Sequence, residues 1–375
     1  MKYACLNPIA QIGLDGFGAG YVKSEDPQEA ELLLVRSADM HEMEISDDLL
    51  AVGRAGAGVN NIPLDKMADR GVVVFNSPGA NANGVKELVI CGMLLASRDI
   101  VGGIGWIKDN ASDPAIGKSA EKAKKAFAGT EIKGKTLGVI GLGAIGAMVS
   151  GSALALGMDV IGYDPYLSPE AAKRLDAAVK VTENLDDVYA SSDYITIHVP
   201  ALESTKGMIN AEAISKMKTG VIFLNFARDL LVNENDMAAA LAEGKVRRYV
   251  SDFPNAVSAN MPGAIVTPHL GASTEESEDN SAIMAVSELK AFAETGAIKN
   301  SVNFPRLDAG EQKSRYRLCV CTKGKTPADL GLDKAGALFA ERGEYGYMII
   351  DTDEKPDEEM LNNTEGVTKT RIIFK

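Results

Sequence analysis

The residues best placed for chemistry on a phosphate-rich ligand form a glycine-rich turn. Its spacing is Gly141-x-Gly143-x-x-Gly146; an apolar run precedes it, and Asp164 ends a second apolar run further on. The first glycine allows a sharp turn, the second lets a pyrophosphate approach the backbone, and the third lets the next helix lie close to a strand. The N-terminus of that helix, at Ala144 and Ile145, offers free N–H groups to phosphates. An acid about 20 residues beyond accepts ribose hydroxyls, so the pattern predicts a dinucleotide site.

Two other interpretations of this region are possible. A glycine turn is weak evidence by itself, and Asp164 stands directly before Pro165, which is also typical of a plain turn residue. Residues 137–158 carry no charge and could mimic a membrane span, but they are rich in Gly, Ser and Ala and end at Asp159. Two strands around a glycine turn account for this composition better than a lipid-facing helix does. Residues 1–10 show no secretory signal.

Composition excludes several classes of function. The chain has 375 residues, enough for two or three domains, and a formal net charge of −13. This charge argues against nucleic acid as a main partner, because nucleic-acid binding needs clustered Lys and Arg. The four cysteines form no CxxC pair or His/Cys ladder, so we expect no metal site and a reducing, cytoplasmic location.

Short apolar runs alternate with helical patterns along most of the chain, which predicts α/β architecture with doubly wound parallel sheets. Residues 83–97 are expected to form a buried helix, and 274–295 a long one. The predicted strands are 31–36, 51–54, 72–75, one in the stretch from 135 up to the glycine turn, one within 157–164 that Asp164 closes, 194–198, 221–225, 246–252, 264–267, 316–321, 347–351 and 370–374.

Two polar segments follow predicted strands, 225–228 and 267–274, where ligands gather in open α/β sheets. They contain Arg228 and His269. Of the three histidines, His41 lies in an acidic stretch and is expected on the surface, whereas His198 ends a strand and could simply satisfy a backbone partner.

These motifs resemble the D-isomer-specific 2-hydroxyacid dehydrogenases over roughly residues 1–305. The matching segments are the glycine turn, His198-Val-Pro200 with Thr205-Lys206, Asn225-x-Ala-Arg228, and Pro268-His269-x-Gly-Ala-Ser-Thr274. The segment 52–60 and the C-terminal region resemble the phosphoglycerate dehydrogenase branch in particular. The resemblance implies NAD-dependent oxidation of D-3-phosphoglycerate, the entry to serine synthesis.

The resemblance also implies the domain organisation: two doubly wound, Rossmann-like lobes with an active-site cleft between them, and a small ACT-like α/β domain. Residues 1–97 begin the substrate lobe, 98–274 form the NAD-binding domain, 275–306 return to the substrate lobe, and 307–375 form the ACT-like domain. We expect this last domain to show about three strands and to be dispensable for hydride transfer. Its segment 321–328 lacks the His and Asn that sense serine in related modules.

Residue roles follow from the same resemblance. Arg228 would bind the substrate carboxylate and carbonyl oxygen, with a planar fork suited to bidentate contact, and His269 would exchange the hydroxyl proton as hydride moves to or from NAD. The backbone of Gly56, Ala57, Gly58 and Val59 would hold the carboxylate from the other lobe, while Arg36 and Arg54 are candidates for a phosphate. The expected NAD contacts are Gly141, Gly143, Ala144, Ile145, Gly146, Asp164, His198, Val199, Pro200, Thr205, Phe226, Ala227, Arg228, Asp252, His269, Gly271 and Ala272.

One departure from the family concerns the partner of His269. The family places a Glu five residues beyond an Asp that corresponds to Asp252, but Val257 stands there, and no acid occurs between Asp252 and His269. Asp252 could pair with the histidine, Asn255 could orient it without charge, or the base could work unpaired. Asp252 is therefore a third candidate catalytic residue.

Other functions stay open at this stage. Another acid, such as glyoxylate, hydroxypyruvate or D-lactate, could be the substrate, and some relatives of this fold are dinucleotide-sensing corepressors. The partners we expect are a small phosphorylated 2-hydroxy acid and a second copy of the chain in a homodimer or higher homo-oligomer, with no membrane and no nucleic acid.

Overall fold

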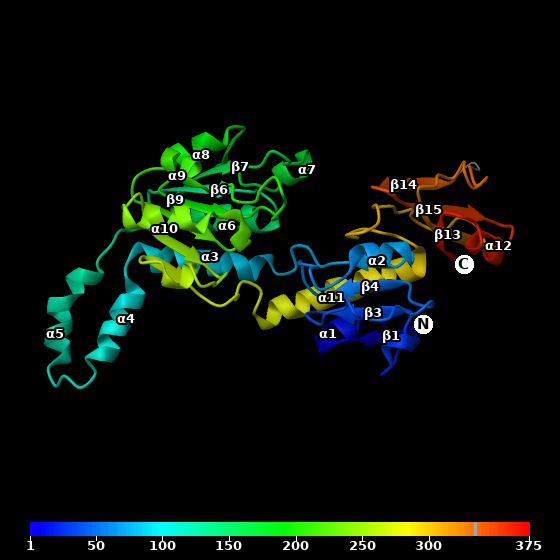
Figure 1. The fold of residues 1–375 in the computed structure, drawn as a ribbon, viewed down its shortest axis with the longest axis horizontal. Helices are drawn as coiled ribbons and strands as arrows, with labels where there is room; N and C mark the ends of the chain where they lie inside the picture. The colour runs from blue at the N-terminus through cyan, green and yellow to red at the C-terminus, as the bar shows by residue number, and fades with distance from the viewer. Residues whose placement is uncertain (334–335) are drawn as a thin grey trace. The chain divides into compact units, whose positions relative to one another are not determined.

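The computed structural model describes residues 1–333 and 336–375, which form two compact units. One unit combines residues 1–81 with 275–375, and the other consists of residues 82–274 (Figure 1). The chain therefore crosses between units twice. The second crossing falls at residues 274 and 275, where the sequence placed it, and the first falls at residues 81 and 82.

The unit of residues 82–274 is built on a seven-stranded parallel sheet with the order β12-β11-β10-β9-β6-β7-β8. The chain runs outward from β6 in one direction and from β9 in the other, so the strand order reverses between these neighbours, and ligands of open α/β sheets bind at such a point. The strands are β6 (Thr136–Ile140), β7 (Asp159–Tyr163), β8 (Lys180–Thr182), β9 (Tyr194–Ile197), β10 (Val221–Asn225), β11 (Val246–Ser251) and β12 (Ala264–Val266).

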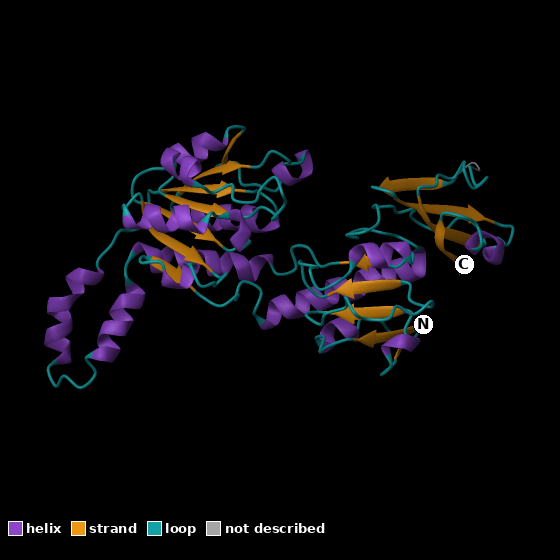
Figure 2. Cartoon of the chain, in the orientation of Figure 1, coloured by secondary structure: helices purple, strands orange, loops and turns teal. Residues whose placement is uncertain are grey.

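Helices cover both faces of this sheet (Figure 2). Strand side chains alternate between two cores: Val139 packs with α3 (Ala82–Ser97) and α6 (Ala144–Ala155), whereas Ile140 packs with the helices of the opposite face. The helices of that opposite face are α8 (Leu185–Ser191), α9 (Ala211–Lys216) and α10 (Glu234–Ala242). The short α7 (Pro169–Ala172) follows β7. The doubly wound fold predicted from the sequence is present.

Helix α3 corrects the predicted domain boundary. Residues 82–97 were placed in the substrate lobe, but Val85, Val89 and Met93 belong to the same buried cluster as β6 and α6. The apolar pattern of α3 predicted a buried helix correctly. It could not indicate which of two similar sheets the helix covers.

Two further helices, α4 (Ile100–Asp109) and α5 (Ile116–Ala123), contain no buried residue. Together they form the paired extension of this unit in Figure 1. Within the described residues no single helix is long and apolar enough to cross a membrane; α3 and α4 pass that test only as a pair bent by 67°.

The other unit contains a five-stranded parallel sheet with the order β2-β1-β3-β4-β5. Leu32 and Leu34 face a core that includes α11 (Glu275–Thr295), and Leu33 and Val35 face the opposite core, beside α2 (Leu64–Asp69). The strands are β1 (Lys2–Cys5), β2 (Val22–Lys23), β3 (Leu32–Val35), β4 (Ala51–Arg54) and β5 (Val73–Phe75), and α1 (Gln11–Leu14) follows β1.

The C-terminal residues form a four-stranded antiparallel sheet with the order β14-β15-β13-β16. Its elements are β13 (Tyr316–Lys323), β14 (Leu338–Arg342), β15 (Tyr345–Thr352), α12 (Glu358–Asn362) and β16 (Val367–Phe374). The expectation of about three strands was wrong, because β14 was missed. β14 is short and none of its residues is fully buried, and its apolar residues 338–340 are followed directly by the charged pair Glu341-Arg342, so the strand signal is weak.

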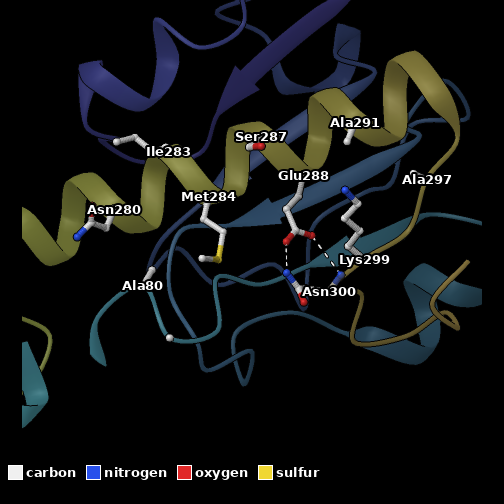
Figure 3. Close-up of a pocket in the computed structure, with 11 residues that line it drawn as sticks. Ala80, Asn280, Ile283, Met284, Ser287, Glu288, Ala291, Ala297, Lys299 and Asn300 are labelled. Carbon is white, nitrogen blue, oxygen red and sulfur yellow. Dashed lines mark hydrogen bonds between the residues drawn. The ribbon is translucent and has the colours of Figure 1, made fainter. Parts of the chain in front are cut away.

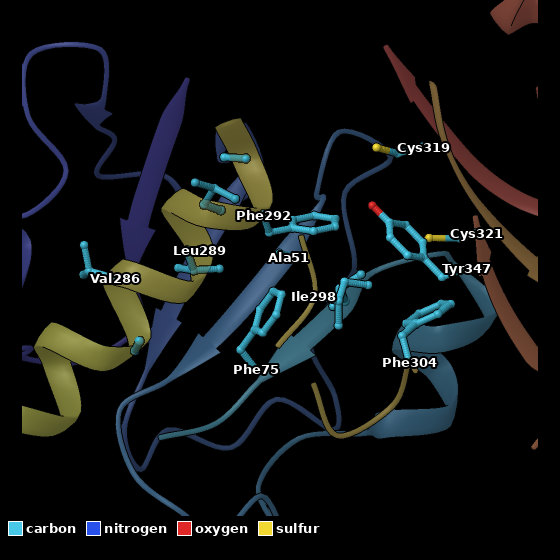
Figure 4. Close-up of a cluster of buried hydrophobic side chains, with 14 of the residues drawn as sticks. Ala51, Phe75, Val286, Leu289, Phe292, Ile298, Phe304, Cys319, Cys321 and Tyr347 are labelled. Atoms are coloured by element: carbon cyan, nitrogen blue, oxygen red, sulfur yellow. The ribbon is translucent and has the colours of Figure 1, made fainter. Parts of the chain in front are cut away.

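This sheet is part of the core of its unit and not a loosely appended module. Its side chains Cys319, Cys321 and Tyr347 share a buried cluster with Phe292 of α11 and with Phe304 (Figure 4). The Tyr347 hydroxyl donates to the Gly296 carbonyl at 2.7 Å, just beyond the end of α11. Removing residues 307–375 would uncover this cluster, so the contacts argue against the expectation that the C-terminal region is dispensable.

Candidate active site

The glycine turn after β6 has the geometry that its sequence predicts. Gly141 adopts a φ of +93°, and a Cβ there would lie 2.7 Å from the carbonyl oxygen of His198. A Cβ on Gly146 would lie 1.9 Å from the carbonyl oxygen of Gly141, whereas one on Gly143 would have no atom within 4 Å. The turn therefore requires two of its glycines for backbone reasons and leaves open space at the third.

These residues fit a dinucleotide. Helix α6 begins at Ala144 with Gly143 as its N-cap, and no side chain of the described residues caps it. The N–H groups of its first turn are thus available to a pyrophosphate, and the open backbone at Gly143 gives the phosphate oxygens room to approach. The residues that would hold the pyrophosphate are Gly141, Gly143, Ala144, Ile145 and Gly146.

Asp164 lies half-buried just beyond β7, where the predicted ribose ligand belongs. Its Oδ2 accepts a hydrogen bond from the Leu142 N–H and its Oδ1 accepts one from the Tyr166 N–H, both at 2.9 Å. The carboxylate thus fixes the glycine turn and also satisfies the loop that follows β7. The structure shows the turn role of Asp164, and the ribose role stays a prediction, which these two hydrogen bonds permit because a carboxylate oxygen can accept more than one hydrogen bond.

His198 follows β9, on the other side of the point where the strand order reverses. Its backbone N–H donates to the Ile140 carbonyl at 2.7 Å, and its Nε2 lies 3.0 Å from the Thr196 hydroxyl. Burial lowers the pKa of His198 to about 3, so its imidazole is neutral and cannot serve as an acid near neutral pH. The loop after it, from Val199, is held by Thr205, whose hydroxyl donates to the Pro200 carbonyl at 2.6 Å.

Arg228 follows β10 in a loop fixed by Asn225. The Asn225 amide donates to the Arg228 carbonyl at 2.8 Å, and its oxygen accepts the Ala227 N–H at 3.1 Å. The guanidinium of Arg228 donates to the Ala227 carbonyl at 2.6 Å. Phe226, predicted as an NAD contact, is 6% exposed and belongs to the buried core beside α3. We assign Phe226 a structural role because its ring packs in that core.

Asp252 directly follows β11, and its side chain bonds the loop that follows β12. It is 1% exposed, and its Oδ2 accepts the Gly271 N–H at 2.9 Å. Burial raises the pKa of the Asp252 carboxyl, while the Gly271 N–H and the charges of His269 and Arg228 oppose that rise. The hydrogen bond sets the position of Gly271 and Ala272, and so of the segment that carries His269.

His269 is exposed and contacts an aromatic ring. The imidazole lies 4.5 Å from the Phe253 ring, centroid to centroid, with 43° between the planes. The Arg228 guanidinium carbon lies 5.7 Å from the same ring. The proposed base and the proposed substrate-binding group therefore meet at one side chain, at the carboxyl edge of the sheet.

Asn255, one of the two partners considered for His269, forms its hydrogen bonds with other groups. The Asn255 amide donates to Glu234 Oε1 at 2.6 Å, and its oxygen accepts the N–H groups of Val257 and Ser258, both at 2.9 Å. Within residues 82–274 no side chain hydrogen-bonds the His269 imidazole. Asp252 acts on it through charge alone in this structure.

The predicted substrate groups of the other unit follow β3 and β4, and Val35 pairs with Arg54 in the sheet register. Arg36 forms an ion pair with Glu278 at 2.6 Å. The Arg54 guanidinium lies across Gly56, which has a φ of +146° and lacks the side chain that would block it. Asn76 and Ser77 hold the loop of Gly56, Ala57, Gly58 and Val59 by hydrogen bonds to the carbonyls of Ala57, Arg54 and Gly56.

A cavity of about 540 Å³ lies beside α11 in this unit but contains none of these groups (Figure 3). Met284, Glu288 and Asn300 line it. Both oxygens of Glu288 accept hydrogen bonds from Asn300, and burial raises the pKa of Glu288. No group of three or more His, Cys, Asp or Glu side chains in the described part of the chain is placed to hold a metal ion.

Two residues of the site were not predicted. Phe253 was not among the expected site residues, and Asn225 appeared only as part of a motif. The sequence signal for Asn225 is its position at the end of a buried strand, where an amide is placed to satisfy the turn that follows. Nothing in the sequence indicates that the Phe253 ring faces His269.

The fold and the glycine turn together define a dinucleotide-binding α/β protein, and the matches specify it further. Residues 91–271 match the family model described as D-isomer specific 2-hydroxyacid dehydrogenase, NAD binding domain. The chain belongs to the D-isomer-specific 2-hydroxyacid dehydrogenase family, and residues 82–274 contain its NAD-binding domain.

Among its relatives are two curated D-3-phosphoglycerate dehydrogenases. The protein from Methanocaldococcus jannaschii is 35% identical over 311 residues, which cover 80% of this chain and 57% of that protein. The protein from Mycobacterium tuberculosis is 37% identical over 333 residues, covering 84% of this chain and 61% of that one. The chain thus spans about six-tenths of the length of these relatives.

Solved structures share the fold. The NAD⁺-bound 3-phosphoglycerate dehydrogenase of Entamoeba histolytica is 26% identical, covers 82% of this chain and 99% of its own, and has a TM-score of 0.63. A glyoxylate reductase from Paecilomyes thermophila has a TM-score of 0.65 at 23% identity, with 80% of this chain and 98% of that one covered. The second likeness concerns the fold alone.

Proposed function

We propose that this chain is an NAD-dependent D-3-phosphoglycerate dehydrogenase. It would oxidise D-3-phosphoglycerate to 3-phosphohydroxypyruvate, the first step of serine synthesis. The observation that carries the proposal is the placement of Arg228 and His269 against one ring, at the carboxyl edge of the sheet that also bears the glycine turn. The names of the curated relatives support the choice of substrate.

Arg228 supplies the group that would bind the substrate. One of its N–H donors is committed to the Ala227 carbonyl, which fixes the direction of the guanidinium. The remaining donors of the fork suit the carboxylate and the C2 oxygen of a 2-hydroxy acid, because both oxygens can be contacted at once. Asn225 holds the Arg228 backbone and thereby sets the position of this contact.

His269 is the group that would exchange the hydroxyl proton. An exposed imidazole without a hydrogen-bonded partner in its own unit is free to take that proton in oxidation and return it in reduction. When bound, NAD supplies the hydride acceptor at C2. Asp252 would orient the nicotinamide amide, and its buried charge would favour the protonated imidazole that forms as the proton is taken.

The phosphate of the substrate would be bound by Arg54 or Arg36 of the other unit, because a phosphate needs a cation. Arg36 forms an ion pair with Glu278, which a phosphate would have to displace or share. The loop of Gly56, Ala57, Gly58 and Val59 would contribute backbone N–H groups to the carboxylate.

Spectrophotometric assay of NADH tests this function directly. With hydroxypyruvate phosphate we expect NADH oxidation at a kcat/KM well above that for glyoxylate, hydroxypyruvate or pyruvate. A preference for an unphosphorylated acid would make the chain a different member of the family. Binding of NADH without turnover of any of these acids would favour a dinucleotide-sensing protein.

A second copy of the chain is the partner we propose for α4. Ile100, Val101, Ile104 and Ile107 are 37%, 50%, 52% and 45% exposed, and their spacing places them along one face of the helix. Light scattering should give a homodimer or larger homo-oligomer, and Ile104→Asp should shift it toward the monomer. A monomeric wild type would overturn this assignment. We propose a cytoplasmic location, in keeping with four free cysteines.

A further inference from the structure

The proposed base lacks a carboxylate partner in its own segment. Residues 253–268, which lead from Asp252 to His269, contain no Asp or Glu. Asp252, whose charge interacts with His269, directs its Oδ2 to the Gly271 N–H. Something other than a hydrogen-bonded acid must therefore fix the plane of the imidazole.

The Phe253 ring contacts both His269 and Arg228. The centroid distance of 4.5 Å and the interplanar angle of 43° are within the range of favourable aromatic pairs. The Arg228 guanidinium, at 5.7 Å from the ring centroid, is within cation–π range. A single rigid side chain thus touches both groups that the proposed reaction needs.

The backbone around Phe253 is itself fixed. Its N–H donates to the Ser251 hydroxyl at 3.1 Å. Pro254, which follows it, restricts the backbone angles of Phe253. The hydrogen bond from Gly271 to Asp252 ties the segment of Phe253 to the segment of His269. The ring and the imidazole are therefore held together by two connected loops, after β11 and after β12.

We propose that Phe253 is a positioning residue of this active site, and that its ring takes over the orienting role that a carboxylate has in the family. The proposal rests on the function proposed above. The ring holds the His269 plane without fixing a proton on either nitrogen, and it sets the separation between base and Arg228. Its π face also favours the imidazolium modestly, whereas Arg228 opposes that charge and Asp252 favours it.

Substitution at Phe253 gives the kinetic test. We expect Phe253→Leu to lower kcat about tenfold, because a misplaced base reacts more slowly, and to raise the substrate KM because Arg228 loses its support. The acidic limb of the pH–rate profile should move to lower pH. Phe253→Tyr keeps the ring and should restore kcat, KM and profile. The matched control is Phe374→Leu, which makes the same substitution at a ring that is 66% exposed at the end of β16 (Val367–Phe374), and it should change none of these.

Nuclear magnetic resonance gives a readout independent of turnover. The chain has three histidines, and His198, with a pKa of about 3, does not titrate in the working range. The Cε1 proton of His269 should show a ring-current shift relative to the exposed His41 in the wild type, and Phe253→Leu should abolish it. This measurement on the wild type stands even if Phe253→Leu fails to fold.

The outcomes separate this proposal from the proposed function. If His269→Ala is inactive but Phe253→Leu has wild-type kcat, KM and pH profile, the positioning role is wrong and the function stands. If the wild-type His269 signal shows no ring-current shift, the contact is wrong. If no 2-hydroxy acid is turned over yet the shift is present, the proposed function fails while the contact remains.

Discussion

The two parallel sheets present different kinds of groups at their carboxyl edges. In the unit of residues 82–274, Asp164, Asn225 and Asp252 each hydrogen-bond a backbone N–H, and so fix the loops that would carry a ligand. In the other unit the edge carries two arginines, Arg36 and Arg54, and a glycine loop. Amides or hydroxyls hold the backbone at both edges, but the first edge adds acids that fix its loops, whereas the second adds cations.

This difference suggests that the first edge positions the reacting groups and the second recognises the substrate. A reacting centre needs groups held to within a fraction of an ångström, and buried hydrogen-bonded side chains supply that rigidity. Recognition of a phosphate needs positive charge more than rigidity. We therefore expect substitutions at the first edge to act mainly on kcat or on the cofactor, and substitutions at the second edge to act mainly on the choice of substrate.

The largest effect should follow from His269→Ala. Removing the proton-exchanging group should lower kcat by roughly 10² or more, the usual scale for general acid–base catalysis, while NAD binding persists. Steady-state kinetics and NADH fluorescence measure the two quantities. Near-normal turnover would remove His269 from the mechanism and with it the contrast between the edges.

Arg54→Ala should have the next largest effect, and only on phosphorylated substrate. Loss of a charge-assisted hydrogen bond costs roughly 1.5–3 kcal/mol, or about 10- to 150-fold in kcat/KM for hydroxypyruvate phosphate. Hydroxypyruvate should lose far less. Arg36→Ala is the parallel variant, and it tests the other candidate for the phosphate, whose guanidinium pairs with Glu278. Equal losses for both substrates would make Arg54 structural.

Much of the first edge could be predicted from sequence, because backbone requirements leave a strong pattern. Gly141 and Gly146 are fixed by contacts that no Cβ would allow, so their spacing is diagnostic. Apolar runs located the strands that are buried on both faces, such as β3, β9 and β10, because such a strand must be apolar throughout. The short strands β1, β2 and β8 and the partly exposed β14 were not predicted.

What the sequence could not provide was pairing between distant side chains. The contacts of Phe253 with His269, of Glu234 with Asn255 and of Arg36 with Glu278 join residues 15 or more positions apart. None has a local spacing rule, unlike the glycine turn. The core shared by the C-terminal sheet and α11 has the same origin, since an apolar strand does not show which surface it will cover.

Asp164 predicts the choice of cofactor. A carboxylate near the ribose 2′ position repels a 2′-phosphate, so we expect NAD to be preferred over NADP by at least about tenfold, roughly 1.4 kcal/mol. Asp164→Asn keeps an oxygen for the Leu142 N–H and should narrow that preference without destroying the turn. Equal turnover with both cofactors in the wild type would leave Asp164 with only its structural role.

The smallest effect concerns Asp252, whose charge faces both His269 and Arg228. An anion near an imidazole favours its protonated form, so Asp252→Asn should move the acidic limb of the kcat/KM profile to lower pH. Asparagine keeps an acceptor for the Gly271 N–H, so the loop should hold its shape. An unchanged profile with weaker NAD binding would assign Asp252 to the cofactor alone. The base would then depend on Phe253 for its orientation and on no carboxylate of its own unit for its charge.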